Sequence, residues 1–191
     1  MEKIILASQS PRRKQLLEWA EIPFEIKVKE TAETWPDGLP VEEIPVHIAR
    51  GKAQVVAETL DSNQLVLAAD TVVVLNNEII GKPRDREDAI QILGKLSGQT
   101  HSVITGVVMR KSDQEWAFAD RTEVRFHPLT REQIAYYVDH YKPYDKAGAY
   151  AIQEWIGVVG IHSIHGDFYN VMGLPVSRVV FTLQNQVFKR L

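Results

Sequence analysis

Residues 65–80 read LVLAADTVVVLNNEII, an almost unbroken apolar run followed by a turn signal and a short apolar return. The run Leu65–Leu75 predicts a buried strand, because continuous apolar stretches of this length suit a strand that is covered on both faces. Asn76-Asn77 is typical of a tight turn, so Glu78-Ile79-Ile80 is expected to return as the hairpin partner. A hairpin at this place predicts a sheet that is not purely parallel.

The flanking sequence alternates strands and helices irregularly. Before the run we predict strands over Lys3–Ser8 and Phe24–Val28, a helix opened by Ser10-Pro11, and a helix from Pro45 to about Leu60. After it we predict a helix that is capped by Asp85 and ends at Ser97-Gly98, followed by strands over about His101–Arg110 and Glu115–Phe126. The Thr130/Gln133 capping-box pattern then predicts the start of another helix. Strand patterning follows within Ala151–Ile164, and a terminal helix is predicted from Pro175. This order favours a mixed-sheet α/β fold with α+β character.

Composition narrows the class of protein further. The chain has 191 residues, 45% hydrophobic and 25% charged, which predicts one domain over residues 1–191 with a single core or two small lobes. The formal net charge of −3 gives no positive field for a nucleic acid, and the absence of cysteine excludes disulfides and thiolate chemistry. The apolar stretch Ile4–Ala7 is too short for a signal peptide and no run could span a membrane, so a cytoplasmic protein is expected.

The segment Ser8–Lys14, with the sequence SQSPRRK, joins the first predicted strand to the first predicted helix. Ser10 followed by proline is typical of an N-cap with proline at the first helical position. A helix N-terminus offers unpaired N–H groups and the positive end of the dipole to a phosphate, and Arg12 and Arg13 match phosphate oxygens in pairs. The alternative is a plain capped helix with a solvated basic face, although cations in a first turn oppose the helix dipole.

Asp70 is the second candidate, because it lies inside the apolar run. Burying a carboxylate is costly unless a cation, a metal or hydrogen bonds compensate for the loss of water. We therefore interpret Asp70 as acting on a metal ion or on a water molecule. The alternative is a structural aspartate at a strand end or a bulge.

Three further residues give weaker signals. Lys82 is held between Gly81 and Pro83 before a predicted helix, but no Walker A sequence occurs in the chain. Two weaker candidates are Lys52 on the second predicted helix and Glu33 in the proline-rich loop Thr31–Pro45. Lysine and glutamate are usually exposed to solvent and without a specific function. Taken alone, the residues predict an anion site for a phosphate-like group and a carboxylate suited to a divalent metal.

Seven runs, taken in order, resemble the Maf family of nucleoside triphosphate pyrophosphatases. They are ILASQSPRRKQLL (5–17), ARGKA (49–53), AADTVV (68–73), GKPRDREDA (81–89), LSGQTHSVITGV (96–107), YDKAGAYAIQ (144–153) and VMGLP (171–175). The resemblance implies a two-lobed mixed α/β domain around a central groove, similar to inosine triphosphate pyrophosphatases. It also implies a hydrolase of phosphoric anhydrides that releases a nucleoside monophosphate and pyrophosphate and uses a divalent metal, Mg²⁺ or Mn²⁺.

The resemblance also implies roles for single residues. Phosphates would be held by Ser8, Ser10, Arg12 and Arg13, with added positive charge from Lys52 and Lys82. Glu33 and Asp70 would lie at the metal and the catalytic water, with Asp70 as the proton acceptor. The trio Arg12, Thr71 and Gln153 matches the branch that acts on dTTP and UTP. The chain departs from the family pattern at Glu154, where many relatives carry glycine, and this places a charge beside Gln153.

Three questions stay open at this level. Asp70 could bind the metal directly or act as the base, and these roles conflict because a metal depresses carboxylate basicity. The substrate could instead be a methylated purine triphosphate. The chain could also be a nucleotide-binding regulator, since the family has an association with septum formation. The expected partner is a nucleoside triphosphate, with no nucleic acid, no membrane and a possible homodimer.

Overall fold

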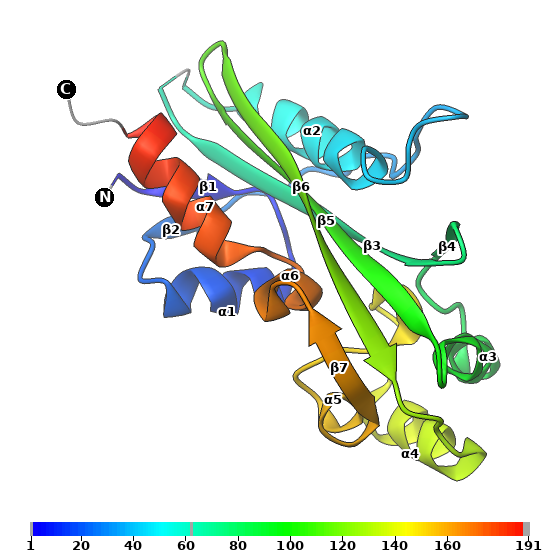
Figure 1. The fold of residues 1–191 in the computed structure, drawn as a ribbon. Helices are drawn as coiled ribbons and strands as arrows, with labels where there is room; N and C mark the ends of the chain where they lie inside the picture. The colour runs from blue at the N-terminus through cyan, green and yellow to red at the C-terminus, as the bar shows by residue number, and fades with distance from the viewer. Residues whose placement is uncertain (1, 62, 189–191) are drawn as a thin grey trace. The chain divides into compact units, whose positions relative to one another are not determined.

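The computed structural model describes residues 2–61 and 63–188. It has a mixed α/β fold with a seven-stranded sheet in the order β2-β1-β3-β5-β6-β7, in which β4 pairs with β3 (Figure 1). Strand β1 runs parallel to β2 and β3, whereas the β3–β4 and β6–β7 pairs are antiparallel. The predicted mixed sheet is therefore confirmed.

The strands are β1 (Ile4–Leu6), β2 (Phe24–Ile26), β3 (Val66–Leu75), β4 (Glu78–Ile80), β5 (Thr100–Lys111), β6 (Gln114–Phe126) and β7 (Ile161–His165). The helices are α1 (Pro11–Trp19), α2 (Ile44–Ala57), α3 (Arg86–Leu96), α4 (Arg131–Tyr141), α5 (Trp155–Gly160), α6 (Phe168–Met172) and α7 (Val176–Thr182). A 3-10 turn covers Ala147–Ala149, and a π-helical turn covers Leu183–Val187 after α7.

Local signals account for most of these boundaries. Asn76 and Asn77 both have positive φ, as the turn between β3 and β4 requires. The Asp85 side chain caps α3 by accepting the Asp88 N–H, and Thr130 and Gln133 form the complete capping box of α4. The strand patterning predicted within Ala151–Ile164 is confirmed for β7, whereas the short helix α5 that precedes it in this segment was not predicted.

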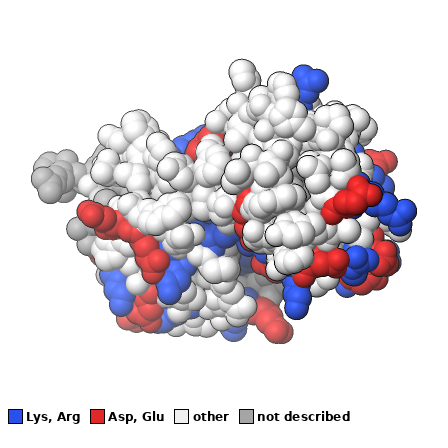
Figure 2. Space-filling model, turned by 90° about the horizontal axis from the view of Figure 1, so that it is seen from below, with Lys and Arg blue, Asp and Glu red and all other residues white. Residues whose placement is uncertain are grey.

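Charged side chains of both signs are intermixed on the face shown in Figure 2. This agrees with a chain that has 22 basic and 25 acidic residues. Exposed pairs such as Lys14 with Glu18 contribute little to stability, because water and salt screen them. Among the described residues, no helix is both long enough and apolar enough to cross a membrane.

The chain forms two compact units, and each is discontinuous in sequence. Unit 1 contains residues 1–70, 105–120 and 173–191, and unit 2 contains residues 71–104 and 121–172. Neighbouring residues Asp70 and Thr71 therefore belong to different units. The central groove implied by the family resemblance stays a prediction.

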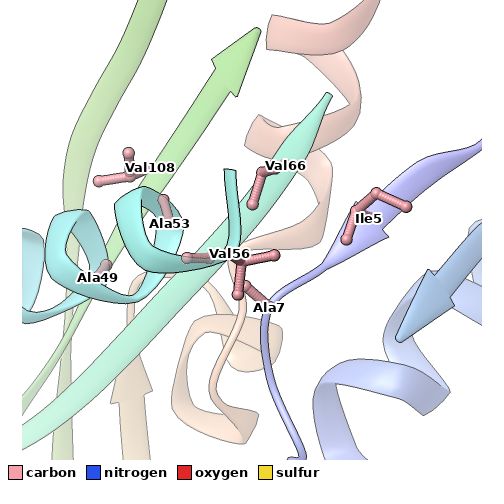
Figure 3. Packing of buried hydrophobic residues seen from close by; sticks show 8 residues of the cluster. Ile5, Ala7, Ala49, Ala53, Val56, Val66 and Val108 are labelled. Atoms are coloured by element: carbon pink, nitrogen blue, oxygen red, sulfur yellow. The ribbon is translucent and has the colours of Figure 1, made fainter. Parts of the chain in front are cut away.

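The core of unit 1 lies between α2 and one face of the sheet (Figure 3). Ile5 and Ala7 from the first strand segment, Val66 and Ala68 from β3, and Val108 from β5 contact Ala49, Ala53 and Val56 of α2. Alternate strand residues point to the opposite face, and Ile4, Leu6 and Leu67 on that face are also fully buried. Burial on both faces explains the unbroken apolar run of β3.

Helix α2 packs against the sheet backbone without an intervening side chain at Gly106. A Cβ atom built on Gly106 would lie 2.2 Å from the Val46 nitrogen and 2.3 Å from the Pro45 carbonyl carbon. The small side chains of Ala49 and Ala53 continue this close approach along the helix. Glycine is required here for space rather than for backbone freedom.

Three rings form the interior of unit 2. His101, Phe126 and Tyr150 meet edge to face, with centroids 5.0–5.4 Å apart. The His101 Nε2 atom lies 2.7 Å from the Tyr150 hydroxyl, while its buried Nδ1 atom has no hydrogen-bond partner among the described residues. Burial lowers the pKa of His101 to about 4, because the charged imidazolium is poorly solvated there.

The packing at Gly106 predicts the effect of one added methyl group. We expect Gly106→Ala to lower the free energy of unfolding by about 2 kcal/mol or more, since α2 must move to relieve the overlap. Gly51→Ala on the same helix is the matched control, because its Cβ would meet nothing within 4 Å. The control should be neutral or stabilising by about 0.5–1 kcal/mol. Urea unfolding measures both, and a Gly106→Ala protein of wild-type stability would contradict the interpretation.

The burial of His101 predicts a dependence of stability on pH. The unfolded chain binds a proton near pH 6.5 and the folded chain only near pH 4, so stability is lost as the pH falls through this window. We expect this one group to account for at most about 3 kcal/mol. Unfolding measured between pH 7 and pH 4.5 should show a shallower loss in His101→Gln, whereas exposed His47→Gln should retain the wild-type slope. Equal slopes in all three proteins would show that His101 does not contribute.

Candidate active site

The turn before α1 is built by two serines. Ser10 is the N-cap of α1, and its hydroxyl accepts the Arg13 N–H at 3.4 Å. The Ser8 hydroxyl accepts the Ser10 N–H at 3.2 Å and is itself buried. Pro11 occupies the first turn, where its missing N–H costs no helical hydrogen bond. The predicted capped helix is confirmed, and its N-terminus carries the two arginines.

Arg13 is buried at this turn, and its side chain donates hydrogen bonds to two atoms of unit 1. Its Nη1 donates to Ser8 Oγ at 3.1 Å, and its Nε donates to the Gly173 carbonyl at 2.8 Å. Desolvation lowers the pKa of Arg13, and the charge of Arg12 adds to this effect, whereas the carboxylates of Asp70 and Glu33 oppose it. Negative groups stabilise a buried cation, and Asp70 and Glu33 have this effect on Arg13.

Asp70 faces α2 because of the alternation along β3. Val66 and Ala68 point to α2, and Asp70 is the next residue of this row. Helix α2 presents Lys52 between Gly51 and the buried Ala53. Close packing of the helix therefore brings the Lys52 amine within reach of the carboxylate.

Lys52 joins the two candidate carboxylates. Its Nζ lies 2.7 Å from Asp70 Oδ1 and 2.7 Å from Glu33 Oε1. The side chains of Lys52 and Asp70 are 17% and 14% exposed, whereas Glu33 is 46% exposed on its loop. Two carboxylate oxygens thus converge on one cationic point, which solvent reaches from the Glu33 side.

The donor set fits a hard divalent cation. Asp70 and Glu33 supply carboxylate oxygens, which Mg²⁺ and Mn²⁺ prefer. Among residues 2–61 and 63–188 there is no cluster of three or more His, Asp or Glu suited to a metal. A protein that offers two carboxylates leaves coordination positions for water and for substrate phosphates, as is common for Mg²⁺.

The other predicted residues lie in unit 2. Thr71 is half-buried on β3, Lys82 is exposed after β4, and Gln153 is exposed before α5. The segments of Lys82 and Gln153 are connected, because the Gly148 N–H donates to the Gly81 carbonyl at 3.1 Å. Within unit 1 the structure brings together Ser8, Ser10 and Arg13, and separately Glu33, Lys52 and Asp70, with Arg13 acting electrostatically on both carboxylates.

Sequence reasoning missed several residues that support the site. Gly173, whose carbonyl accepts from Arg13, and Lys146, a buried lysine, both lie in runs that carry the family resemblance. The sequence does not indicate a special role for Tyr137, because a tyrosine on an amphipathic helix commonly packs into the hydrophobic core. Only the spatial partners of these residues distinguish them.

Comparison with known proteins assigns the chain to a family. The model of the family described as "Maf-like protein" matches residues 3–186. The dTTP/UTP pyrophosphatase of Phocaeicola vulgatus is 49% identical over 183 residues, covering 95% of this chain and 95% of that protein. The dTTP/UTP pyrophosphatase of Cytophaga hutchinsonii is 52% identical over 182 residues, covering 95% and 83%. The solved Staphylococcus aureus Ham1 protein is similar at a TM-score of 0.46 and 17% identity, over 65% of this chain and 72% of that one.

Within unit 1 the structure thus has a capped helix N-terminus with a buried arginine, and two carboxylates that converge on one lysine. The chain belongs to the Maf-like protein family.

The contacts of Arg13 predict a structural role beside any binding role. We expect Arg13→Ala to lower the free energy of unfolding by about 2 kcal/mol, because two buried hydrogen bonds to a charged group are lost. Lys14→Ala is the matched control, since Lys14 is exposed and pairs only with Glu18, at 3.7 Å. Its effect should stay within about 0.5 kcal/mol. Chemical denaturation compares the two, and equal stabilities would mean that Arg13 is not held as described.

Proposed function

We propose that this protein is a dTTP/UTP pyrophosphatase, which hydrolyses the triphosphate between its α- and β-phosphorus atoms. The relatives of about half identity over nearly the whole chain carry this name. The observation that carries the proposal is the Lys52 ammonium at 2.7 Å from both Asp70 and Glu33, beside the cationic turn of α1. Phosphate binding alone requires cations, whereas water activation also requires a carboxylate.

Asp70 is the proton acceptor in this proposal. A water oxygen attacks the α-phosphorus, its proton passes to the Asp70 carboxylate, and the bond to the bridging oxygen of the β-phosphate breaks. The products are the nucleoside monophosphate and pyrophosphate, and the proton then leaves Asp70 for solvent. Lys52 fixes Asp70 Oδ1 at 2.7 Å and so orients the carboxylate toward the water. A divalent metal held by Glu33 and the substrate phosphates, beside Asp70, would supply charge neutralisation on the phosphate oxygens and would leave Asp70 the basicity of a proton acceptor.

In this proposal different cations bind different phosphate groups of the substrate. Arg12 and Arg13 lie at the N-terminus of α1, where the helix dipole and unpaired N–H groups also favour an anion. Lys82, exposed on its loop, adds charge for the leaving pyrophosphate. Ser8 and Ser10 position this turn through their hydrogen bonds to Arg13. Arg12, Thr71 and Gln153 set the preference for pyrimidine nucleotides.

The cellular role that we propose is removal of surplus or modified nucleotides before polymerases use them. This role places the protein in the cytoplasm, where these triphosphates are consumed. A nucleotide-binding regulator would bind the same ligands without multiple turnover, so catalysis distinguishes the two functions. Homodimer formation stays a prediction.

Pyrophosphate release from a panel of nucleoside triphosphates tests the proposal. With Mg²⁺ or Mn²⁺ we expect multiple turnover of dTTP and UTP well above that of purine triphosphates, with the monophosphate as the other product. Asp70→Asn should lower kcat by at least about a hundredfold, since general-base catalysis contributes about this much, while the circular dichroism spectrum is unchanged. Asp113→Asn, in the exposed turn between β5 and β6, should retain full activity.

Three results would count against the proposal. Normal turnover in Asp70→Asn would refute the mechanism. Preference for a methylated purine triphosphate would retain the reaction and refute the substrate. Tight nucleotide binding without any release of pyrophosphate would favour the regulator instead.

A further inference from the structure

Gln153 has an exposed side chain on a buried backbone. The residues before it, Ala151 and Ile152, are each 4% exposed, and the Glu154 N–H closes a turn on the Ala151 carbonyl at 3.1 Å. An exposed amide has no packing of its own to hold it. Its direction therefore depends on how firmly the backbone on either side is fixed.

One hydroxyl contacts the backbone before Gln153 and the side chain of the residue after it. Tyr137 is fully buried on α4, and its hydroxyl accepts the Ala151 N–H at 3.1 Å. The same hydroxyl donates to the Glu154 carboxylate. Tyr137 therefore joins the residue two positions before Gln153 to the residue directly after it.

The Glu154 side chain contacts Tyr137 instead of capping its own helix, α5. It occupies the N-cap position of α5, yet its side chain makes no hydrogen bond to the helix N-terminus. The carboxylate instead reaches Tyr137 and lies 3.7 Å from Lys146 Nζ. The Lys146 side chain is 11% exposed, and a cation at this depth requires negative partners, of which Asp145 at 2.8 Å is the other.

The surrounding backbone is packed too tightly to adapt. Ala149 has a φ of 58°, a left-handed conformation that disfavours a residue with a side chain. A Cβ on Gly148 would lie 3.0 Å from Val73, and one on Gly157 would lie 1.7 Å from the Ile152 carbonyl oxygen. Strain and close approach on both sides of Gln153 persist only where the neighbouring contacts hold the chain in place.

We propose that Tyr137, Lys146 and Glu154 are positioning residues for Gln153 and thereby set the discrimination between nucleobases. This inference rests on the proposed function, in which Gln153 contributes to the choice of base. Hydrogen bonds weaken steeply with misalignment, so a small shift of the Gln153 amide lowers the preference for the base that it fits. Binding of the phosphate chain belongs to other segments and does not pass through this network.

Tyr137→Phe removes the hydroxyl and retains the buried ring. We expect the ratio of kcat/KM for UTP to kcat/KM for GTP to fall about tenfold, corresponding to loss of one well-aligned polar contact. The inhibition constant of inorganic pyrophosphate should stay within twofold, since pyrophosphate has no base. Tyr136→Phe is the matched control, because Tyr136 is the preceding residue and is 45% exposed. A purely structural effect would lower turnover of both nucleotides equally and leave the ratio unchanged.

Glu154→Gln provides a second variant if Tyr137→Phe does not fold. Its amide oxygen can still accept from Tyr137, but the negative charge facing Lys146 is lost. We expect a smaller fall of the same ratio, about threefold, with faster hydrogen exchange at the Ala151 amide. An unchanged ratio in a folded Tyr137→Phe or Glu154→Gln protein would overturn the proposal.

Gln153→Ala, measured in parallel, separates this inference from the proposed function. If Gln153→Ala lowers the ratio and the positioning variants do so as well, the network acts through Gln153. If Gln153→Ala lowers the ratio and Tyr137→Phe does not, the inference fails and the proposed function stands. If Gln153→Ala leaves the ratio unchanged while dTTP and UTP remain preferred, the role of Gln153 and the inference fail together. A wild-type protein without turnover would refute the proposed function itself.

Discussion

Contact between the backbone of α2 and Gly106 is the constraint on which unit 1 depends. The helix approaches the sheet without an intervening side chain, so its position along β5 allows very little variation. Ala49 and Ala53 retain this spacing along the helix. Because Lys52 lies beside Ala53, its distance of 2.7 Å from Asp70 follows from backbone packing rather than from the flexibility of a long side chain.

The proposed anion site lies in a chain that is nearly neutral. The net charge is −3, so attraction for a phosphate chain must arise locally. Burial of Arg13 lowers its pKa because desolvation outweighs the nearby carboxylates. Two carboxylates, Asp70 and Glu33, and three cations, Arg12, Arg13 and Lys52, interact within unit 1. The ligand of the proposed function, a triphosphate with a divalent cation, would bring charges of both signs to this set.

The sequence predicts element boundaries correctly where local side-chain chemistry determines the structure. The Asn76-Asn77 turn, the Asp85 cap and the Thr130/Gln133 capping box are local signals, and each predicted element boundary there is confirmed. Within residues 151–164 the strand was predicted but α5 was not, because α5 requires a close local approach of Gly157 to the Ile152 carbonyl that residue periodicity does not indicate. At the site, Ser10 and Asp70 stand out by their position in the sequence. The convergence of Lys52 on Glu33, and of Tyr137 on Glu154, joins distant segments and has no sequence pattern.

The hydrogen bond from Arg13 to the Gly173 carbonyl has a consequence for biosynthesis. The two residues are 160 positions apart, so the arginine emerges from the ribosome long before its acceptor does. The described part of the last segment of unit 1, residues 173–188, follows all segments of unit 2 along the chain. Contacts between residues so far apart in sequence form late in folding, because the entropy cost of closing the long loop comes before the favourable energy of the contact. The turn of α1 can therefore acquire its final hydrogen bonds only after Gly173 has been synthesised.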